Sequence, residues 1–373
     1  MRKSRCLNRI AVSALAAAMC ITAAEAAAPR LEGTCTPPGT WEARTPNTIG
    51  TIVRAWGQFF PPNGRLYLMG GRSDDAAGDD FLRPAFYDPI SDTWTTTSAV
   101  FEDNQVNNMV GGVLDFGGIS YIVVVGGSAA GATTSTSAVR QYDPITDTLT
   151  VLLSDSWIGN MDGFTLPGGA AVYNNKLYVF GGFDIGFGML NSIYQFDPSA
   201  PDGSRWTQMA SALPTPIGYI PTATSNGLIY LLGGSTFDGG TGTLQDSTES
   251  SVFNPDTDAI QPISPSPRAT AETRAVTQTD GTVWVLGGGR VPPNPSNEVD
   301  IYDPSTDTWT TGPAFTNPRR NLAADIDPAT GSIWAVGGYD TDGLTPLAFN
   351  EEFTPCVVDD DTIFADGFDG TAP

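Results

Sequence analysis

The feature that most constrains this chain is a pair of adjacent glycines that ends each of several short apolar segments. The clearest copy is residues 176–182, Lys-Leu-Tyr-Val-Phe-Gly-Gly. Six pairs follow one another at steps of 50 to 56 residues: Gly70-Gly71, Gly126-Gly127, Gly181-Gly182, Gly233-Gly234, Gly287-Gly288 and Gly337-Gly338. Self-similarity at this period indicates one structural unit that is repeated and stacked against its neighbours. We therefore expect a single domain built from six similar units.

Each unit contains four segments that are typical of β-strands, which we call A to D. Strand A is rich in small residues, as in residues 168–172, and a tight turn such as Asn-Gly at residues 63–64 leads into strand B, which ends in Gly-Gly. Asn-Gly allows positive φ at both central positions of a hairpin. Strand C ends in aromatic-Asp-Pro, as in residues 302–304, and strand D carries a tryptophan or a smaller apolar residue. Four antiparallel strands per unit form one propeller blade.

The double glycine, the later tyrosine and the later tryptophan resemble the hallmarks of the kelch repeat family. Residues 287–288 together with Tyr302 and Trp309 match most fully, and the resemblance covers about residues 40–355. Two repeats carry a smaller residue in the tryptophan position: Leu149 and Ile260. The resemblance implies an all-β fold, a six-bladed kelch-type β-propeller of the galactose oxidase-like superfamily.

The sixth repeat lacks a tryptophan-containing strand D after its strand C, which ends at residues 353–355. The missing sequence occurs near the other end, because Gly-Thr-Trp-Glu-Ala-Arg at residues 39–44 looks like Asp-Thr-Trp-Thr-Thr at residues 307–311. We predict that the N-terminal segment supplies the outer strand of the last blade, which removes an open edge. Cys35 and Cys356 would then lie at the same composite blade and form a disulfide, the alternative being two unpaired thiols.

Residues 1–26 are typical of a secretory signal peptide. An apolar stretch at residues 10–21 precedes Ala-Glu-Ala at residues 24–26, a small-x-small cleavage site. Four basic residues precede the apolar stretch: Arg2, Lys3, Arg5 and Arg9. The apolar stretch is too short to span a membrane. We expect an exported protein of bacterial type that is secreted, periplasmic or at the cell surface.

We therefore expect the propeller to occupy residues 27–356 and an acidic tail to occupy residues 357–373. The tail reads either as a solvated segment or as a sorting or anchoring signal of the kind that ends various exported bacterial proteins. In the second case the chain would serve as a structural protein of the cell envelope.

Charge and composition exclude several classes of function. The formal charge is −23, so phosphate backbones and anionic membrane surfaces are repelled. The chain has no histidine, which removes the commonest general base and a common metal ligand. Copper oxidases that resemble galactose oxidase need histidine ligands, so this chemistry is excluded. We expect a monomer without a cofactor, more in keeping with a binding protein than with an enzyme.

Strand alternation places the A–B and C–D turns on one face of the propeller, the turn face. The longer B–C and D–A connections lie on the other, the loop face, where we expect ligands to bind. Carboxylates of the B–C loops could bind Ca²⁺, although solvated acidic loops are the more common outcome. The residues concerned are Asp74, Asp75, Asp79, Asp80, Asp184, Asp238, Asp340 and Asp342.

Basic residues gather where strand A begins, although the chain is acidic overall. Four of them are candidates for binding a carboxylate at the mouth of the central channel: Arg54, Arg274, Arg319 and Arg320. Arg268 belongs to the same group, and the alternative is that these arginines pair with carboxylates such as Glu272 and Asp325. We predict a binding module for a protein or glycan on the loop face. The alternative is a carbohydrate-active enzyme, either a glycoside hydrolase or similar to the kelch-type sialic-acid epimerases.

Overall fold

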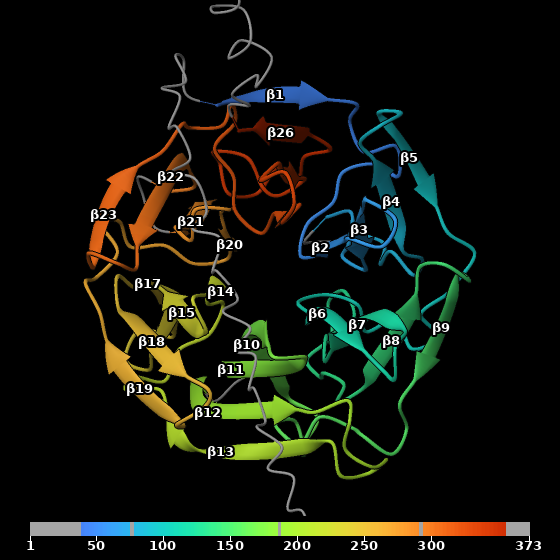
Figure 1. Ribbon diagram of the computed structural model, residues 1–373, viewed down its shortest axis with the longest axis vertical. Helices are drawn as coiled ribbons and strands as arrows, with labels where there is room; N and C mark the ends of the chain where they lie inside the picture. The colour runs from blue at the N-terminus through green and yellow to red at the C-terminus, as the bar shows by residue number, and fades with distance from the viewer. Residues whose placement is uncertain (1–38, 75–77, 186–187, 291–293, 356–373) are drawn as a thin grey trace, which may run out of the picture. The chain divides into compact units, whose positions relative to one another are not determined.

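The computed structural model describes residues 39–74, 78–185, 188–290 and 294–355. They form six antiparallel sheets of four strands each, arranged as blades around a central axis (Figure 1). The prediction of an all-β, six-bladed propeller is confirmed. No helix in these ranges has the length and apolar character needed to cross a membrane. The predicted signal peptide, Cys35, Cys356 and the acidic tail lie outside the described residues.

In the first three blades the strands run from the axis outward in chain order. Blade 1 contains β2 (Trp56–Phe60), β3 (Arg65–Met69), β4 (Ala85–Asp88) and β5 (Thr93–Thr96). Blade 2 contains β6 (Val110–Asp115), β7 (Ser120–Val125), β8 (Val139–Asp143) and β9 (Thr148–Val151). Blade 3 contains β10 (Thr165–Tyr173), β11 (Lys176–Asp184), β12 (Gly188–Phe196) and β13 (Trp206–Ala212).

The other three blades repeat this order, except that one contains an inserted hairpin and one takes its outermost strand from the N-terminal part of the propeller. Blade 4 contains β14 (Thr222–Ser225), β15 (Leu228–Leu232), β18 (Ser250–Asn254) and β19 (Ala259–Pro262), with a separate hairpin of β16 (Ser235–Asp238) and β17 (Thr243–Asp246) inserted after β15. Blade 5 contains β20 (Ala275–Thr277), β21 (Val283–Gly288), β22 (Ser296–Asp303) and β23 (Thr308–Thr311). Blade 6 contains β24 (Ala323–Ile326), β25 (Ile333–Val336), β26 (Asn350–Thr354) and, outermost, β1 (Thr40–Arg44).

Strand β1 closes the ring, as predicted. It pairs antiparallel with β26, in a register that sets Trp41 opposite Phe353. The Trp41 ring lies 5.4 Å from that of Phe315 and 5.6 Å from that of Phe353, measured between centroids. The two ends of the propeller are thereby joined through main-chain hydrogen bonds and a shared aromatic cluster.

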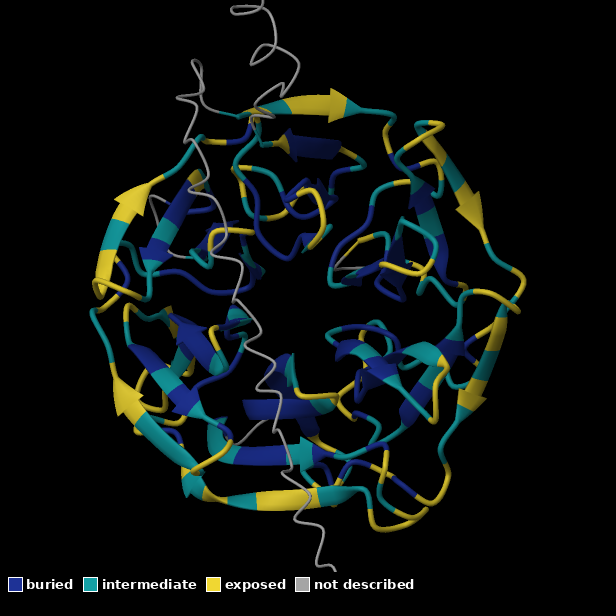
Figure 2. Ribbon diagram, viewed as in Figure 1, coloured by how far each residue is buried: buried dark blue, intermediate teal, exposed yellow. Residues whose placement is uncertain are grey.

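The core of the propeller lies between blades as well as within them, and the outermost strands are largely exposed (Figure 2). At each of the six interfaces a pair of aromatic rings from adjacent blades meets at 4.9 to 6.3 Å between centroids. The pairs are Phe59–Trp334, Tyr67–Tyr142, Phe116–Phe196, Phe180–Phe253, Tyr230–Tyr302 and Trp284–Phe353. Such contacts add to the apolar area buried and fix the angle between neighbours.

The repeated tryptophans join blades 1, 3, 5 and 6 to the blade that precedes each of them. Trp94 on β5 donates its indole N–H to the carbonyl of Thr45, at 2.9 Å, in the connection that follows β1. Three others do the same: Trp41 to Pro313, Trp206 to Asp155 and Trp309 to Ser264. Leu149 and Ile260 cannot form this bond, so blades 2 and 4 depend on a second contact.

That second contact comes from an aspartate just before strand D. Asp307 adopts φ +53° and accepts the Ser264 N–H of blade 4 at 2.8 Å and the Tyr302 hydroxyl at 2.8 Å. Asp92, Asp147 and Asp258 occupy equivalent positions with φ between +50° and +52°. Asp147 and Asp258 accept main-chain N–H groups from the preceding blade, which compensates for the missing tryptophans. In blades 1, 2 and 5 the tyrosine of strand C therefore orients the carboxylate that binds the neighbouring blade.

These aspartates predict an acid-sensitive fold. The Ser264 N–H and the Tyr302 hydroxyl lower the pKa of Asp307. A lowered folded-state pKa means that the stabilisation is present above the unfolded pKa of about 3.9 and is lost as the pH falls through the folded value. We expect the urea concentration at the denaturation midpoint to decrease when the pH is lowered below about 4. The variant Asp307→Asn should have a lower midpoint at neutral pH and should lose less of it on acidification. An identical pH dependence in the variant would argue against this role.

Candidate functional site

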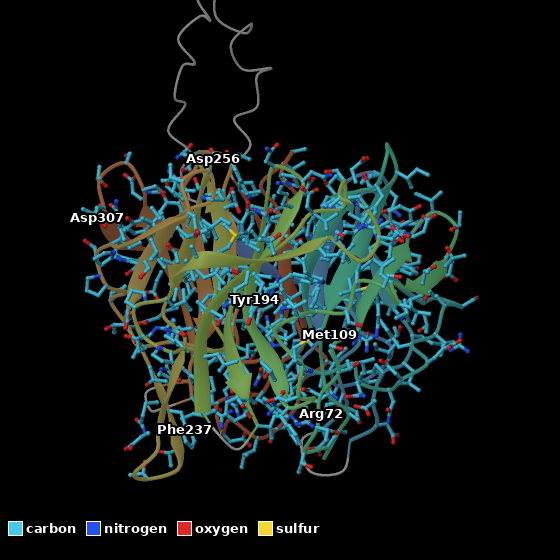
Figure 3. The ribbon with its side chains drawn as sticks, turned by 90° about the horizontal axis from the view of Figure 1, so that it is seen from below. Arg72, Met109, Tyr194, Phe237, Asp256 and Asp307 are labelled. Atoms are coloured by element: carbon cyan, nitrogen blue, oxygen red, sulfur yellow. The ribbon has the colours of Figure 1, made fainter. Side chains whose placement is uncertain are left out.

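The innermost strands β2, β6, β10, β14, β20 and β24 surround a central channel, each in contact with its two neighbours around the ring. Two cavities follow one another along it, of about 70 Å³ near the loop face and about 400 Å³ toward the turn face. Trp56 and Arg274 line both cavities. In Figure 3, Asp256 and Asp307 of the C–D turns lie at one end of the propeller and Phe237 at the other, as strand alternation predicts.

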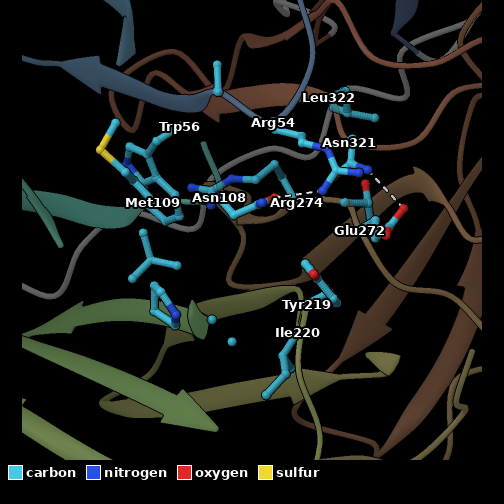
Figure 4. Close-up of a pocket in the computed structure, with 16 residues that line it drawn as sticks. Arg54, Trp56, Asn108, Met109, Tyr219, Ile220, Glu272, Arg274, Asn321 and Leu322 are labelled. Atoms are coloured by element: carbon cyan, nitrogen blue, oxygen red, sulfur yellow. Dashed lines mark hydrogen bonds between the residues drawn. The ribbon is translucent and has the colours of Figure 1, made fainter. Parts of the chain in front are cut away.

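A collar of residues in the left-handed conformation surrounds the narrow cavity (Figure 4). Its members precede the first strand of their blades by two or three residues and have φ between +51° and +60°: Arg54, Asn108, Tyr219, Glu272 and Asn321. Main-chain hydrogen bonds link collar residues of adjacent blades, as from the Arg54 N–H to the Asn321 carbonyl at 3.1 Å. Left-handed non-glycine residues are strained and concentrate at functional sites, so the collar is the first candidate for ligand contact.

Glu272 carries the negative charge of the collar and is surrounded by arginines. It forms salt bridges with Arg290 and Arg320, and it accepts the Asn321 side-chain N–H at 2.9 Å. Burial alone would raise the pKa of Glu272, but Arg290, Arg320 and Arg54 outweigh burial and lower it. Glu272 is therefore ionised and neutralises part of a positive cluster, which is the pairing that the sequence left as an alternative for Arg320.

Arg274 lies deeper in the channel and is held mainly by packing. Its guanidinium carbon stands 3.2 Å from the centroid of the Trp56 ring. Burial lowers the pKa of Arg274 to about 10, and Asp325 acts in the opposite direction without cancelling the effect. The group stays protonated at neutral pH. Arg54 and Arg274 thus both line the channel, Arg54 at the collar and Arg274 between the two cavities, and their binding of a ligand stays a prediction.

Arg319 does not line either channel cavity. Its side chain is completely buried and forms a salt bridge with Glu351 on β26, whose side chain is 2% exposed. It also donates to the carbonyl of Gly337 at 3.3 Å, so it holds the double glycine of blade 6. The role that the structure supports for Arg319 is structural.

The same arrangement recurs in two other blades: Arg268 with Asp300 and Gly287, and Arg140 with Asp103 and Gly126. In blades 5 and 6 the arginine comes from the D–A connection and the carboxylate from strand C. In blade 2 the charges are exchanged, since Arg140 is on β8 and Asp103 in the connection. This exchange shows that the contact requires opposite charges but not a particular order.

Carboxylates of the acidic loops accept hydrogen bonds from other groups of the protein. Asp80 accepts the Asn107 side chain and the Ala130 N–H, and Asp342 accepts the Leu344 and Thr345 N–H groups. Within the described part of the chain, no group of three or more acidic, histidine or cysteine residues is arranged to hold a metal. Asp75 lies outside that part. Asp342 thus stabilises its own loop, whereas Asp80 joins the B–C loop of blade 1 to the connection before β6 and to the B–C loop of blade 2.

A groove of about 420 Å³ adjoins the collar on the loop face. Arg54 and Arg72 stand at its inner end, and Leu166, Phe183 and Ile185 form an apolar wall. Burial and the nearby charge of Arg54 lower the pKa of Arg72. Sequence reasoning did not single out Trp56, Tyr219 or Arg72, and only the alignment of equivalent positions before strand A could have identified the collar.

Comparison with known proteins gives matches that cover part of the chain. The Kelch motif matches residues 273–316. Beta-scruin of Limulus polyphemus is 24% identical over 193 residues, covering 48% of this chain and 19% of scruin. Kelch-like protein 35 of Mus musculus is 27% identical over 168 residues, covering 45% of this chain and 26% of that protein. The chain thus spans about a fifth to a quarter of these relatives.

A solved structure, titled a novel fungal alcohol oxidase with catalytic diversity among the AA5 family, in complex with copper, superimposes with a TM-score of 0.58. Its sequence identity is 16%, and the match covers 85% of this chain and 76% of the oxidase, so the likeness concerns the fold alone. The Kelch motif, the similarity to Kelch-like proteins and the six-bladed ring together support the resemblance of this chain to the kelch repeat family.

Proposed function

We propose that this chain is a binding module whose loop face holds a protein ligand. The observation that carries the proposal is the groove beside the collar, which combines an apolar wall with arginines at its inner end. A ligand segment with an apolar side chain next to a carboxylate would match both features. The six blades hold the surrounding loops on a rigid support, which suits recognition.

Exposed apolar side chains lie beside this groove. Met161 is 83% exposed, and Phe164 is 36% exposed in the same D–A connection. The Phe164 carbonyl accepts the N–H of Ile185, a residue of the groove wall, at 2.9 Å. Apolar side chains gathered next to a concave surface mark a site of association, whereas the exposed Ile90 and Ile145 occur singly in separate C–D turns.

The enzymatic alternative would need a carboxylate able to exchange protons near the collar. Glu272 has the position, but both of its carboxylate oxygens are bound by arginines and its pKa is lowered. A general base works best with a pKa near the operating pH. The environment of Glu272 therefore favours charge stabilisation and recognition over proton transfer at the collar. In this proposal the module acts outside the cytoplasm, in keeping with the predicted signal peptide.

The test is the binding of the purified chain to an array of proteins and glycans. We expect protein ligands whose signal falls at least tenfold in the double variant Met161→Glu/Phe164→Glu, because the new charges oppose burial of the apolar contact. Ile145→Glu, at a position in a C–D turn that is 66% exposed, between the values of Phe164 and Met161, is the matched control and should bind normally. Ligands confined to glycans, or equal binding by the double variant, would reject the proposal.

A further inference from the structure

Arg274 differs from the buried arginines that hold the double glycines. Arg140, Arg268 and Arg319 each have a carboxylate partner. The Arg274 side chain forms no hydrogen bond or salt bridge with another residue in the described ranges, and its Nε is buried without a partner. The Trp56 ring covers one face of the guanidinium. Stacking fixes the position of a guanidinium and leaves its N–H donors, which lie in the plane of the group, available.

The wider cavity offers room for a ligand next to this guanidinium. Its volume is about 400 Å³, in the range of about 300 to 1,000 Å³ that is usual for small-molecule sites. Small residues create the space, among them Gly111, Gly112, Ala170 and Ala223.

Most other polar groups of this cavity are already engaged. The Thr222, Thr224 and Thr277 hydroxyls donate to carbonyls, the latter two at 2.8 and 2.9 Å. Gln58 donates to Asp325 at 2.7 Å, and the same Asp325 oxygen accepts the Phe59 N–H at 2.7 Å. Among the charged lining residues Arg274 is thus the donor that a ligand can use.

The charges around Arg274 favour an anion with a single negative charge. Arg54, Arg290 and Arg320 surround Glu272 on the collar side, while Asp325 faces the wide cavity. A planar carboxylate fits the fork of a guanidinium, and a dianion would meet stronger repulsion from Asp325. We propose that Arg274 binds the carboxylate of a small organic acid in the wide cavity of the channel.

Access to this site is from the turn face. Pro61 and Pro328, which follow strands β2 and β24 on the turn-face side, line the wide cavity. The collar narrows the channel at the other end to a cavity of about 70 Å³. The carboxylate site is therefore separate from the groove of the loop face, and either site can exist without the other.

The experiment is calorimetric titration of the full chain with three monocarboxylates: acetate, benzoate and glucuronate. We expect at least one to bind, its neutral amide to bind at least tenfold more weakly, and Arg274→Gln to lose at least tenfold in affinity. Arg274→Lys keeps the charge without the fork and should retain part of the affinity. Arg83→Gln, on the exposed surface, is the matched control and should bind as the original chain does.

Circular dichroism and a thermal melt establish that Arg274→Gln is folded, and Arg274→Lys supplies a second, milder variant if it is not. The absence of binding by all three acids, equal binding of acid and amide, or unchanged affinity in both Arg274 variants would overturn the proposal. Retained carboxylate binding in Met161→Glu/Phe164→Glu is expected, because those residues belong to the other face.

Discussion

Replacing Arg319 by alanine is expected to lower the free energy of unfolding by about 3 to 5 kcal/mol, the cost of leaving one partner of a buried ion pair alone. Both side chains are shielded from water, so the Glu351 carboxyl would be left buried without its ion-pair partner. The variant also loses the donor to the Gly337 carbonyl. Urea denaturation followed by tryptophan fluorescence measures the change.

Exchange of the two charges provides a control that separates pairing from volume. Blade 2 holds the same contact in reversed order, with Arg140 on the strand and Asp103 in the connection. The double variant Arg319→Glu/Glu351→Arg should therefore recover at least half of the stability that Arg319→Glu loses. Additive losses in the double variant would show that the geometry of blade 6 accepts only the original order.

The blade count could be predicted because a main-chain requirement marks it. In the sequence each Gly-Gly follows the apolar segment of strand B, and the spacing of the pairs is kept even where side chains diverge, as at Leu149 and Ile260. The closing strand could be predicted because Trp41 occupies the same place in its sequence segment as Trp309 does in strand D of blade 5. Both signals are local in sequence, and neither depends on the path of a loop.

The site could be located only roughly from the sequence, because its contacts join different blades. Arg319 and Arg320 are adjacent, yet Arg319 binds Glu351 within blade 6 and Arg320 binds Glu272 on the collar. The side chains of adjacent residues in an extended chain point in opposite directions. The two adjacent arginines, which look alike in the sequence, therefore have different roles. Arg290, the second partner of Glu272, comes from the variable loop of blade 5, whose path the repeat does not specify.

The double glycine itself yields the other large prediction. Gly337 has φ +63°, and a β-carbon there would stand 2.2 Å from the carbonyl oxygen of Ile52, which belongs to blade 1. The same oxygen accepts the Gly338 N–H at 2.8 Å, one of the bonds that join the last blade to the first. Gly337→Ala must therefore adopt a left-handed conformation and push the two blades apart.

We expect Gly337→Ala to lower the free energy of unfolding by about 2 to 5 kcal/mol, since the left-handed penalty of roughly 1 to 2 kcal/mol adds to an overpacking cost of about 1 to 3 kcal/mol. Gly64→Ala isolates the first contribution, because Gly64 has φ +67° but no atom within 4 Å of a β-carbon. Its loss should stay near 1 to 2 kcal/mol. Equal losses in urea denaturation would mean that backbone conformation alone explains the glycine, whereas a larger loss at Gly337 shows that the pair is retained for the close approach of neighbouring blades.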